Sequence, residues 1–425
     1  MTSIFVLVVL PLVLLAIGVP IFLVLMATAL AGVFIVDSPV HAVHTAMFGS
    51  LDSFPLLAVP LFIYAGDIMA RGGIARRLIE MILSLVGGVR GSLALATIAS
   101  SSAFGVLSGS SVACVAAIGK LTVPALRKNG YGDRFSVSLV TASGVIDVII
   151  PPSIPMIIYA VTAQQSITVL FLAGFVPGLL VAFVLSVYVY LHARAKMIPI
   201  TAAARWKNIW ATTREAIWSL LAPIVILGGI YGGIFTPTEA AGFACVYAII
   251  VSVFIHRELD WSQLWQITID SVVLIAQILI IVSAAGAFAW LITTSGLPGK
   301  LIGFVDALRL DTWVLLLVIN FVLLFVGSVL EPPAAILMLT PLLTPIAYKA
   351  GVDPVHFGIV VTVNLAVGMF MPPFGLNLFA SHALFGTPLP ALYRGVLPFF
   401  FLYLGVLLVL TYIPAITLWP LQLFR

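Results

Sequence analysis

Long apolar runs dominate this chain, and in two regions helix-breaking and polar residues interrupt them. The sequence has 425 residues, of which 62% are hydrophobic and 8% charged, so it has too few polar groups to cover a soluble protein of this size. The runs are about 20 residues long, enough for a helix to cross the hydrocarbon core of a bilayer. The sequence therefore predicts an all-α integral membrane protein, built as a polytopic helical bundle.

The two interrupted regions have the same layout. The first consists of residues 100–111 and 140–153, and the second of residues 325–333 and 361–375; each contains Gly, Ser, Pro and one acid in an apolar context. A backbone polar group without a partner is costly in lipid unless it lines a cavity or a site. We therefore expect both regions to form binding sites. The alternative is that their small residues only allow close helix packing.

Flanking charges predict that two of the interrupted segments are re-entrant hairpins. Segment 91–126 is split at 108–111 and has basic residues beyond both ends, namely Arg90, Arg127, Lys128 and Arg134. The positive-inside rule places both of these ends in the cytoplasm. Segment 313–347 is split at 327–333, and its flanks hold a nearly balanced mixture of charges. We expect the ends of this second hairpin on the opposite face.

Each hairpin is followed by a segment that we expect to be a discontinuous helix. Segment 135–159 is broken at 144–155, where three prolines and Asp147 forbid a continuous helix. Segment 361–375 carries the corresponding break.

An offset of 221 residues relates the two regions. It carries Ser110 onto Glu331, and it pairs identical residues: Pro124 with Pro345, Gly130 with Gly351, Pro152 with Pro373, Gly174 with Gly395 and Pro177 with Pro398. Five predicted crossings separate the copies, and an odd number gives them opposite orientations. Inverted repeats with broken helices in corresponding positions predict a secondary transporter whose substrate lies at the repeat interface.

This layout divides the chain into four parts. We expect N-terminal scaffold helices in 1–70, repeat 1 in 71–192, a basic connector with middle scaffold helices in 193–263, and repeat 2 in 264–425. The first two helices are expected at 3–17 and 19–36, with Asp37 ending the second. The apolar N-terminus is expected to stay as a membrane helix rather than to be cleaved as a signal peptide. Surface helices are expected near 78–86 and 297–308.

The chemistry available at the breaks is coordination and hydrogen bonding. Carbonyl oxygens of an unwound helix suit a small cation such as Na+, and the amides that begin the next half-helix suit an anionic group. One such centre would be formed by Ser108, Gly109, Ser110 and Ser111 with residues 144–151. The other would be formed by Gly327, Ser328, Thr362 and Asn364 with residues 368–372.

Three acids fall in apolar sequence. Asp147 lies in a predicted break and Glu331 at a predicted hairpin tip, and both are costly in lipid, so both are functional candidates. A structural ion pair or a helix cap is the alternative for each. Asp67 is near enough to Arg71 for an ordinary interfacial pair, so we interpret it as structural.

Cysteines and histidines give little indication of chemistry. Cys114 and Cys245 lie in apolar runs and are expected to be packing residues. The histidines show no metal-ligand spacing, although His356 and His382 remain candidates for a proton relay or a pocket.

Six motifs in order resemble the large membrane subunit of tripartite ATP-independent periplasmic (TRAP) transporters. They lie at residues 60–67, 72–77, 150–159, 228–240, 353–358 and 372–377. The resemblance implies an elevator-type fold like that of the ion transporter superfamily, and Na+ symport of an organic acid such as a C4-dicarboxylate or sialic acid across a bacterial inner membrane. It also implies two partners, a small four-helix membrane subunit and a soluble periplasmic substrate-binding protein. The chain lacks the extra N-terminal helices of fused versions, so we expect the small subunit to be a separate chain.

The resemblance also assigns roles to residues. It places Na+ at Ser108 and Ser110 with the break that includes Gly144, Asp147 and Pro151, and at Gly327 with Thr362, Met369 and Pro372. Substrate would lie by Ser153 and Asn377, and we add Gly109, Ser111, Glu331 and Asn364 as expected substrate contacts. The family position of Asp147 is usually uncharged, which leaves its role open between a feature of a substrate subclass and a different ion preference.

Other functions fit the sequence less well. No segment resembles a nucleotide-binding loop, so the energy must come from an ion gradient. A carboxylate transporter coupled to protons or Na+ that works without a binding protein remains open. A channel would need a continuous polar stripe across several helices. An intramembrane hydrolase could use Ser108 or Ser110, but neither broken segment supplies a His or Lys base. We therefore expect a transporter and no enzyme activity.

Overall fold

The computed structural model describes residues 9–36, 39–200 and 205–422, and these residues contain helices and no strand. The chain begins with α2 (Leu10–Ala16) and α3 (Ile21–Val36), which are separated near Gly18 as expected. Residues 3–8 of the first expected helix and the stop at Asp37 lie outside the described residues. The predicted all-α fold class is confirmed.

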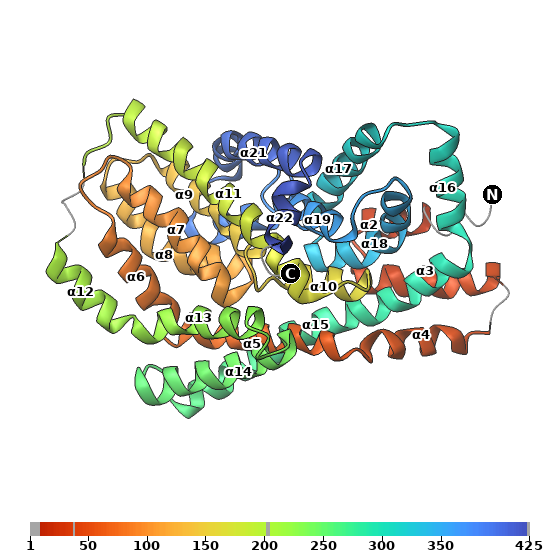
Figure 1. The fold of residues 1–425 in the computed structure, drawn as a ribbon, viewed down its shortest axis with the longest axis horizontal. Coiled ribbons are helices and arrows are strands. Elements are labelled where there is room, and N and C mark those ends of the chain that lie inside the picture. The colour runs from red at the N-terminus through yellow and green to blue at the C-terminus, as the bar shows by residue number, and fades with distance from the viewer. Residues whose placement is uncertain (1–8, 37–38, 201–204, 423–425) are drawn as a thin grey trace.

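Figure 1 shows the remaining helices, which follow here in chain order. The first half contains α4 (His41–Leu51), the 3-10 helix η2 (Phe54–Leu57), α5 (Ala58–Arg71), α6 (Ile74–Leu85), α7 (Ser92–Ser108), α8 (Ser111–Lys128), α9 (Asp133–Ser143), the 3-10 helix η3 (Gly144–Val148), α10 (Ile154–Thr162) and α11 (Ile167–Ala195). The second half contains α12 (Trp206–Glu215), α13 (Ile217–Tyr231), α14 (Pro237–Ile249), the π-helix η4 (Ile250–Ile255), α15 (Trp261–Thr294), α16 (Leu297–Ala307), α17 (Thr312–Val329), α18 (Pro332–Lys349), α19 (Pro354–Gly368), α20 (Leu376–Phe385), α21 (Leu389–Tyr412) and α22 (Ala415–Gln422).

Six helices of the described chain are long and apolar enough to cross a membrane, or up to seven if the bent pair α12 and α13 forms one span. They are Phe54–Arg71, Ile167–Ala195, Pro237–Ile255, Trp261–Thr294, Thr312–Val329 and Leu389–Tyr412. The chain is therefore a multi-pass membrane protein, as its composition predicts.

Long helices form a scaffold along one edge of the molecule. The 34-residue helix α15 packs against α3, α4 and α5, and α14 packs against α5. Figure 1 shows α4, α5, α14 and α15 along the lower edge, with α7–α9 above them on one side and α17–α19 on the other. Local sequence sets two of these helix starts. Thr236 caps α14 and Asp260 caps α15, each through reciprocal bonds with the third helical residue.

The hairpins and helices are interrupted where the sequence predicts. Helix α7 ends at Ser108 and α8 begins at Ser111, with Gly109 in the left-handed region at φ +64°; α17 and α18 are separated at Leu330 and Glu331. The discontinuous helices break between η3 and α10 and between α19 and α20. Gly327 lies within the last turn of α17, two residues before that helix ends. The re-entry of each hairpin to its own membrane face, and the four-part division of the chain, stay predictions.

Helices are present at both places where surface helices are expected, and their position along the membrane surface stays a prediction. Helix α16 begins at Leu297 as expected, but α6 begins at Ile74, four residues before the predicted start. Gly73 explains this earlier start, because its left-handed φ of +80° lets the chain turn directly into the helix. The side chains of Arg76 and Arg77 both contact Glu258, with shortest N–O distances of 2.5 and 2.6 Å. This ion-pair cluster ties α6 to the chain between η4 and α15.

Candidate functional site

A cavity of about 470 Å³ lies where both hairpin tips meet both broken helices. Equivalent residues of the two repeats line it at the offset of 221: Ser110 with Glu331, Ser111 with Pro332, Val112 with Pro333, Val148 with Met369 and Pro155 with Leu376. Helices α5 and α15 close the cavity with Ile63, Asp67, Leu274 and Ile278. The volume is that of a typical small-molecule site, and the internal repeat supplies matching positions on its two sides.

The tip of hairpin 1, residues 108–111, is rich in hydroxyls and amides. Ser111 Oγ donates to Asn377 Oδ1 at 3.0 Å and approaches Met369 Sδ at 3.4 Å. The Asn377 backbone N–H in turn donates to the Met369 carbonyl at 2.9 Å. The first hairpin is therefore joined directly to the break in the second repeat.

The tip of hairpin 2 is built differently. Glu331 precedes α18 but its carboxylate makes no capping bond. Among the described residues it forms no ion pair or side-chain hydrogen bond, and it is exposed to the cavity. Pro332 and Pro333 follow, and neither has an N–H to offer a ligand. This tip presents a free carboxylate and few backbone donors.

Each hairpin crosses its own broken helix in close backbone contact. A Cβ on Gly368 would lie 2.3 Å from the Gly327 carbonyl carbon, and one on Gly105 would lie 2.9 Å from Asp147 Cα. About one helical turn further from the cavity, a side-chain hydrogen bond also joins each hairpin to its broken helix. In the first repeat Ser101 Oγ donates to Ser143 Oγ at 3.1 Å, and in the second Asn364 Nδ2 donates to Asn320 Oδ1 at 2.5 Å. Since Ser143 and Asn364 are related by the same offset of 221, the two repeats hold their hairpins in the same way.

Both crossings bury oxygen atoms that accept no hydrogen bond of normal geometry from the described residues. Asp147 is fully buried, and although the amides of Gly109 and Ser110 are nearby, neither carboxylate oxygen makes a hydrogen bond of normal geometry. Asn364 Oδ1 is likewise buried and without a donor. Hard oxygen ligands of this kind suit Na+, and a bound cation would relieve the cost of leaving them unpaired. The donor chemistry of both breaks therefore fits the expected ion.

Six of the expected site residues line the cavity: Ser108, Gly109, Ser110, Ser111, Glu331 and Met369. Gly144 and Pro151 are buried beside it in the first break, Gly144 against α8, and Pro372 is half-buried in the second break. Gly327 packs on Leu365. Their role as ion ligands stays a prediction.

The other expected contacts are buried and already bonded. The Ser153 hydroxyl donates to the Val148 carbonyl at 2.5 Å and caps α10 by accepting from the Met156 amide. Thr362 donates to the Gly358 carbonyl of its own helix at 2.8 Å. Ser153, Asn364 and Asn377 are not among the residues that line the cavity, so any contact they make with substrate requires a rearrangement.

Asp67 is the charged cavity residue that the sequence interpretation missed. It accepts a hydrogen bond from Ser271 Oγ at 2.6 Å, while Arg71 pairs with Asp270 at 2.6 Å. The expected Asp67–Arg71 pair is therefore wrong. Gly66 brings α5 against hairpin 1, because a Cβ there would lie 3.1 Å from Ser108 Cα. The sequence signal was the adjacent pair Gly66 and Asp67. The sequence alone does not show which helices this pair faces.

The histidine candidates are engaged elsewhere. His356 is buried and its ring nitrogens lie 2.8 Å from Thr417 Oγ1 and 3.2 Å from the Thr411 carbonyl. His382 Nδ1 lies 2.9 Å from the Thr387 carbonyl. Cys114 and Cys245 are buried, as expected of packing residues. Within the described ranges, no group of three or more His, Cys, Asp or Glu residues could hold a metal ion.

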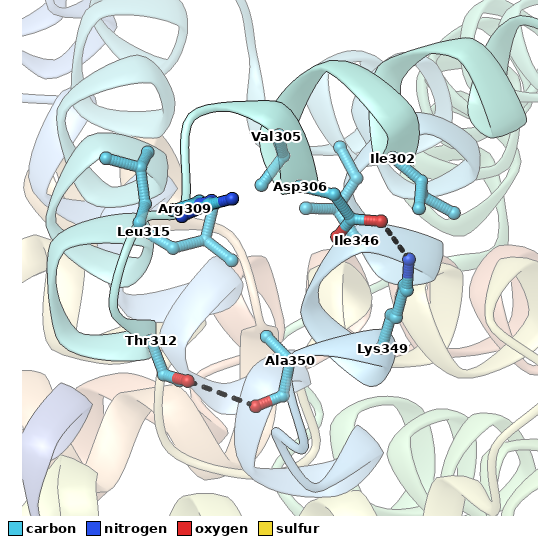
Figure 2. Close-up of a pocket in the computed structure, with 10 residues that line it drawn as sticks. Ile302, Val305, Asp306, Arg309, Thr312, Leu315, Ile346, Lys349 and Ala350 are labelled. Atoms are coloured by element: carbon cyan, nitrogen blue, oxygen red, sulfur yellow. Dashed lines mark hydrogen bonds and ion pairs between the residues drawn. The ribbon is translucent and has the colours of Figure 1, made fainter.

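A second cavity, of about 230 Å³, lies between α16, α17 and α18 (Figure 2). An Asp306–Lys349 ion pair borders it, Arg309 points into it, and Thr312 Oγ1 donates to the Ala350 carbonyl at 3.3 Å. None of its lining residues belongs to a hairpin tip or to a broken-helix gap. The larger cavity is the candidate site.

Residues 8–416 match the model of the family described as "Tripartite ATP-independent periplasmic transporter, DctM component". The chain is 41% identical over 379 residues to the C4-dicarboxylate TRAP transporter large permease protein of Pseudomonas aeruginosa, covering 89% of each chain. It is 37% identical over 410 residues to the ectoine/5-hydroxyectoine TRAP transporter large permease protein of Ruegeria pomeroyi, covering 96% of each. Its fold is similar to that of the Alcanivorax borkumensis YdaH transporter, with a TM-score of 0.66, 15% identity and 88% of each chain covered.

Proposed function

Because the chain belongs to the DctM family of tripartite ATP-independent periplasmic transporters, we propose that it is a large permease subunit that imports an organic acid across a bacterial inner membrane by Na+ symport. The observation that carries this proposal is the cavity at the junction of both breaks, to which the two repeats contribute equivalent residues. Secondary transporters with inverted repeats bind substrate at such a junction. Names of relatives include a C4-dicarboxylate and an ectoine transporter, which supports a small carboxylate as cargo.

The proposed binding chemistry uses groups already at the cavity. Amides at the start of α8 and the hydroxyls of residues 108–111 would bind the substrate carboxylate. Na+ would bind behind each tip, at the buried oxygens of Asp147 and Asn364 and at the main-chain carbonyls of the breaks. Cation binding would make each break compact and so complete the substrate site, which links the two binding events.

Movement and partners complete the proposal. The hairpins and broken helices would move together relative to α5, α14 and α15, as in an elevator. The Ser111–Asn377 bond, which joins the two repeats, supports their movement as one body. A small four-helix membrane subunit would brace the long scaffold helices, and a soluble periplasmic binding protein would deliver the acid.

Uptake into proteoliposomes tests this function. The permease would be reconstituted with its small subunit and binding protein, and entry of the labelled acid that the binding protein retains would be measured with and without a Na+ gradient. We expect saturable uptake that needs both Na+ and the binding protein. Ser110→Ala and Glu331→Gln should each reduce uptake about tenfold or more without changing the amount of assembled protein, on the scale of one lost charge-assisted contact.

Ser102→Ala is the matched control, because among the described residues the Ser102 hydroxyl bonds only to the Ile98 carbonyl of its own helix. It should transport like the unmodified protein. Flux that ignores the gradient would indicate a channel instead. If both site variants keep the uptake rate and the Na+ dependence of the unmodified protein, the cavity is not the transport site.

A further inference from the structure

The candidate cavity is lined by acids and by no basic side chain. Of the described residues that line it, Asp67 and Glu331 are the charged ones, and none is a Lys, Arg or His. The remaining wall is formed by serines, prolines and apolar residues. If both carboxylates are ionised, the side chains give the cavity a formal charge of −2. This is unfavourable for a dianion, because two like charges a few ångströms apart repel strongly in a site of low dielectric.

Among the described residues, neither carboxylate forms an ion pair with a cationic side chain. The ion pairs of the described chain join other residues. Arg71 lies near enough to Asp67 to attract its charge, but the ion pair of Arg71 is with Asp270, at 2.6 Å. Asp67 accepts only the neutral hydroxyl of Ser271, and Glu331 has no side-chain partner among the described residues. Both acids are therefore available to a ligand.

The cavity also has a region that suits an anion. Ser111, Val112 and Ala113 form the first turn of α8 and line the cavity; the amides of a first turn have no partner within their helix, and they lie at the positive end of its dipole. Hairpin 2 lacks this feature, because Pro332 and Pro333 occupy the same positions in α18. The cavity thus offers donors at one tip and carboxylates at the other tip and on α5.

We propose that the cargo is a zwitterion, a small carboxylate that also carries a cationic nitrogen, and that Glu331 and Asp67 recognise this nitrogen. The proposal rests on the proposed transport function and specifies its substrate class. The carboxylate of the cargo would lie at the start of α8, and its cationic group would face Glu331 and Asp67. A dicarboxylate would instead bring its second anionic group to these two acids. Na+ at the carboxylates is the competing explanation, and the experiment separates the two.

Charge-selective labelling tests the proposal without knowledge of the cargo. Ala116, which lines the cavity, is replaced by cysteine in the full chain carrying Cys114→Ala and Cys245→Ala. Its rate of modification is measured with trimethylammonium-ethyl and sulfonato-ethyl methanethiosulfonate, each normalised to a free thiol in solution. We expect the cationic reagent to react about tenfold faster, an ordinary effect for one or two nearby charges. Glu331→Gln and Asp67→Asn should each lower this ratio.

Na+ concentration and added ligands decide between the explanations. The preference for the cationic reagent should persist in saturating NaCl; a ratio that falls to one in NaCl but not in N-methylglucamine chloride would assign the acids to Na+ and overturn the proposal. With 4-aminobutyrate and succinate as matched four-carbon probes, the zwitterion should protect the cysteine better, and stronger protection by succinate would also overturn it. If neither probe protects, the charge ratio alone decides. Labelling needs no transport, so failure of the uptake assay would be separate.

Discussion

The two hairpin tips occupy equivalent places in the fold and differ in chemistry. Tip 1 presents serine hydroxyls and the free amides of α8, whereas tip 2 presents Glu331 and two prolines that have no N–H. Both tips border the same cavity, and both hairpins cross their broken helices through glycine and a buried hydrogen bond. The comparison teaches that the repeat preserves backbone geometry while the side chains at its tips have diverged, which gives a symmetric framework an asymmetric site.

The largest expected difference between the repeats concerns the tightness of the crossings. Gly368→Ala should destabilise the protein by about 3 kcal/mol, because the new Cβ would lie 2.3 Å from backbone that cannot rotate away. Gly105→Ala, at 2.9 Å from Asp147 Cα, should cost about 1–2 kcal/mol. Thermal unfolding in detergent measures both. An equal loss in the two variants would mean that the crossings are equally tight.

Substitutions in the hydrogen bonds beside the two crossings should differ less in their effect on stability. Asn320→Leu removes one of the two acceptors of Asn364 Nδ2, which keeps its bond to the Val360 carbonyl at 3.1 Å, and it removes the donor to Thr411 Oγ1 at 3.0 Å. We therefore expect a loss of about 2 kcal/mol. Ser101→Ala removes one neutral bond to Ser143 and should cost about 1 kcal/mol. Ser102→Ala, whose hydroxyl bonds within its own helix, should be nearly neutral. The same thermal assay would contradict this order if Ser101→Ala proved the more harmful.

At the position of Asp147 in the first repeat, the second repeat has Gly368. A substitution of Asp147 therefore tests whether the first crossing has an ion ligand that the second crossing lacks. Asp147→Asn removes a buried carboxylate that has only the poorly aligned amides of Gly109 and Ser110 nearby, and should stabilise the protein without Na+ by about 1 kcal/mol. It should also reduce the rise in melting temperature that NaCl produces. A variant that is destabilised and keeps the full response to NaCl would show that the carboxylate is structural.

The smallest expected difference is in the acid dependence of the ion pairs on α6 and on α16. Although burial raises the pKa of Glu258, bonds to Arg76 and Arg77 outweigh this effect and hold the pKa below its ordinary value of 4.5. The stabilisation is therefore present above about pH 4.5 and is lost as pH falls through the lower folded-state pKa. Because the cluster is partly exposed, we expect at most about 1 kcal/mol.

Melting temperatures between pH 3 and 7 would measure this loss. Glu258→Gln should flatten the curve at its acidic end. Asp306→Asn, which breaks the exposed Asp306–Lys349 pair on α16, should leave the curve almost unchanged. A larger acid-dependent change in the Asp306 variant would reverse the comparison.

Features encoded locally could be predicted from the sequence. The breaks followed from prolines and glycines in apolar runs. The convergence of Ser108–Ser111 and Glu331 on one cavity followed from the repeat. Side-chain partners could not be predicted: Ser153 turns inward to cap α10, and Asp67 bonds Ser271 rather than Arg71. These depend on helix packing between distant segments, which one sequence does not specify.

The two carboxylates of the cavity belong to parts of the molecule with different attachments. Asp67 is fastened through Ser271 to the longest helix, whereas Glu331 belongs to a hairpin. Any sliding of the hairpins along α5 and α15 would change the gap between these acids. A substrate bound by both carboxylates would lose its contact with one of them during this movement. Its affinity would then be lower after the movement than before it, even at constant ion concentration. Release of the substrate would then follow from the change in distance between the two acids.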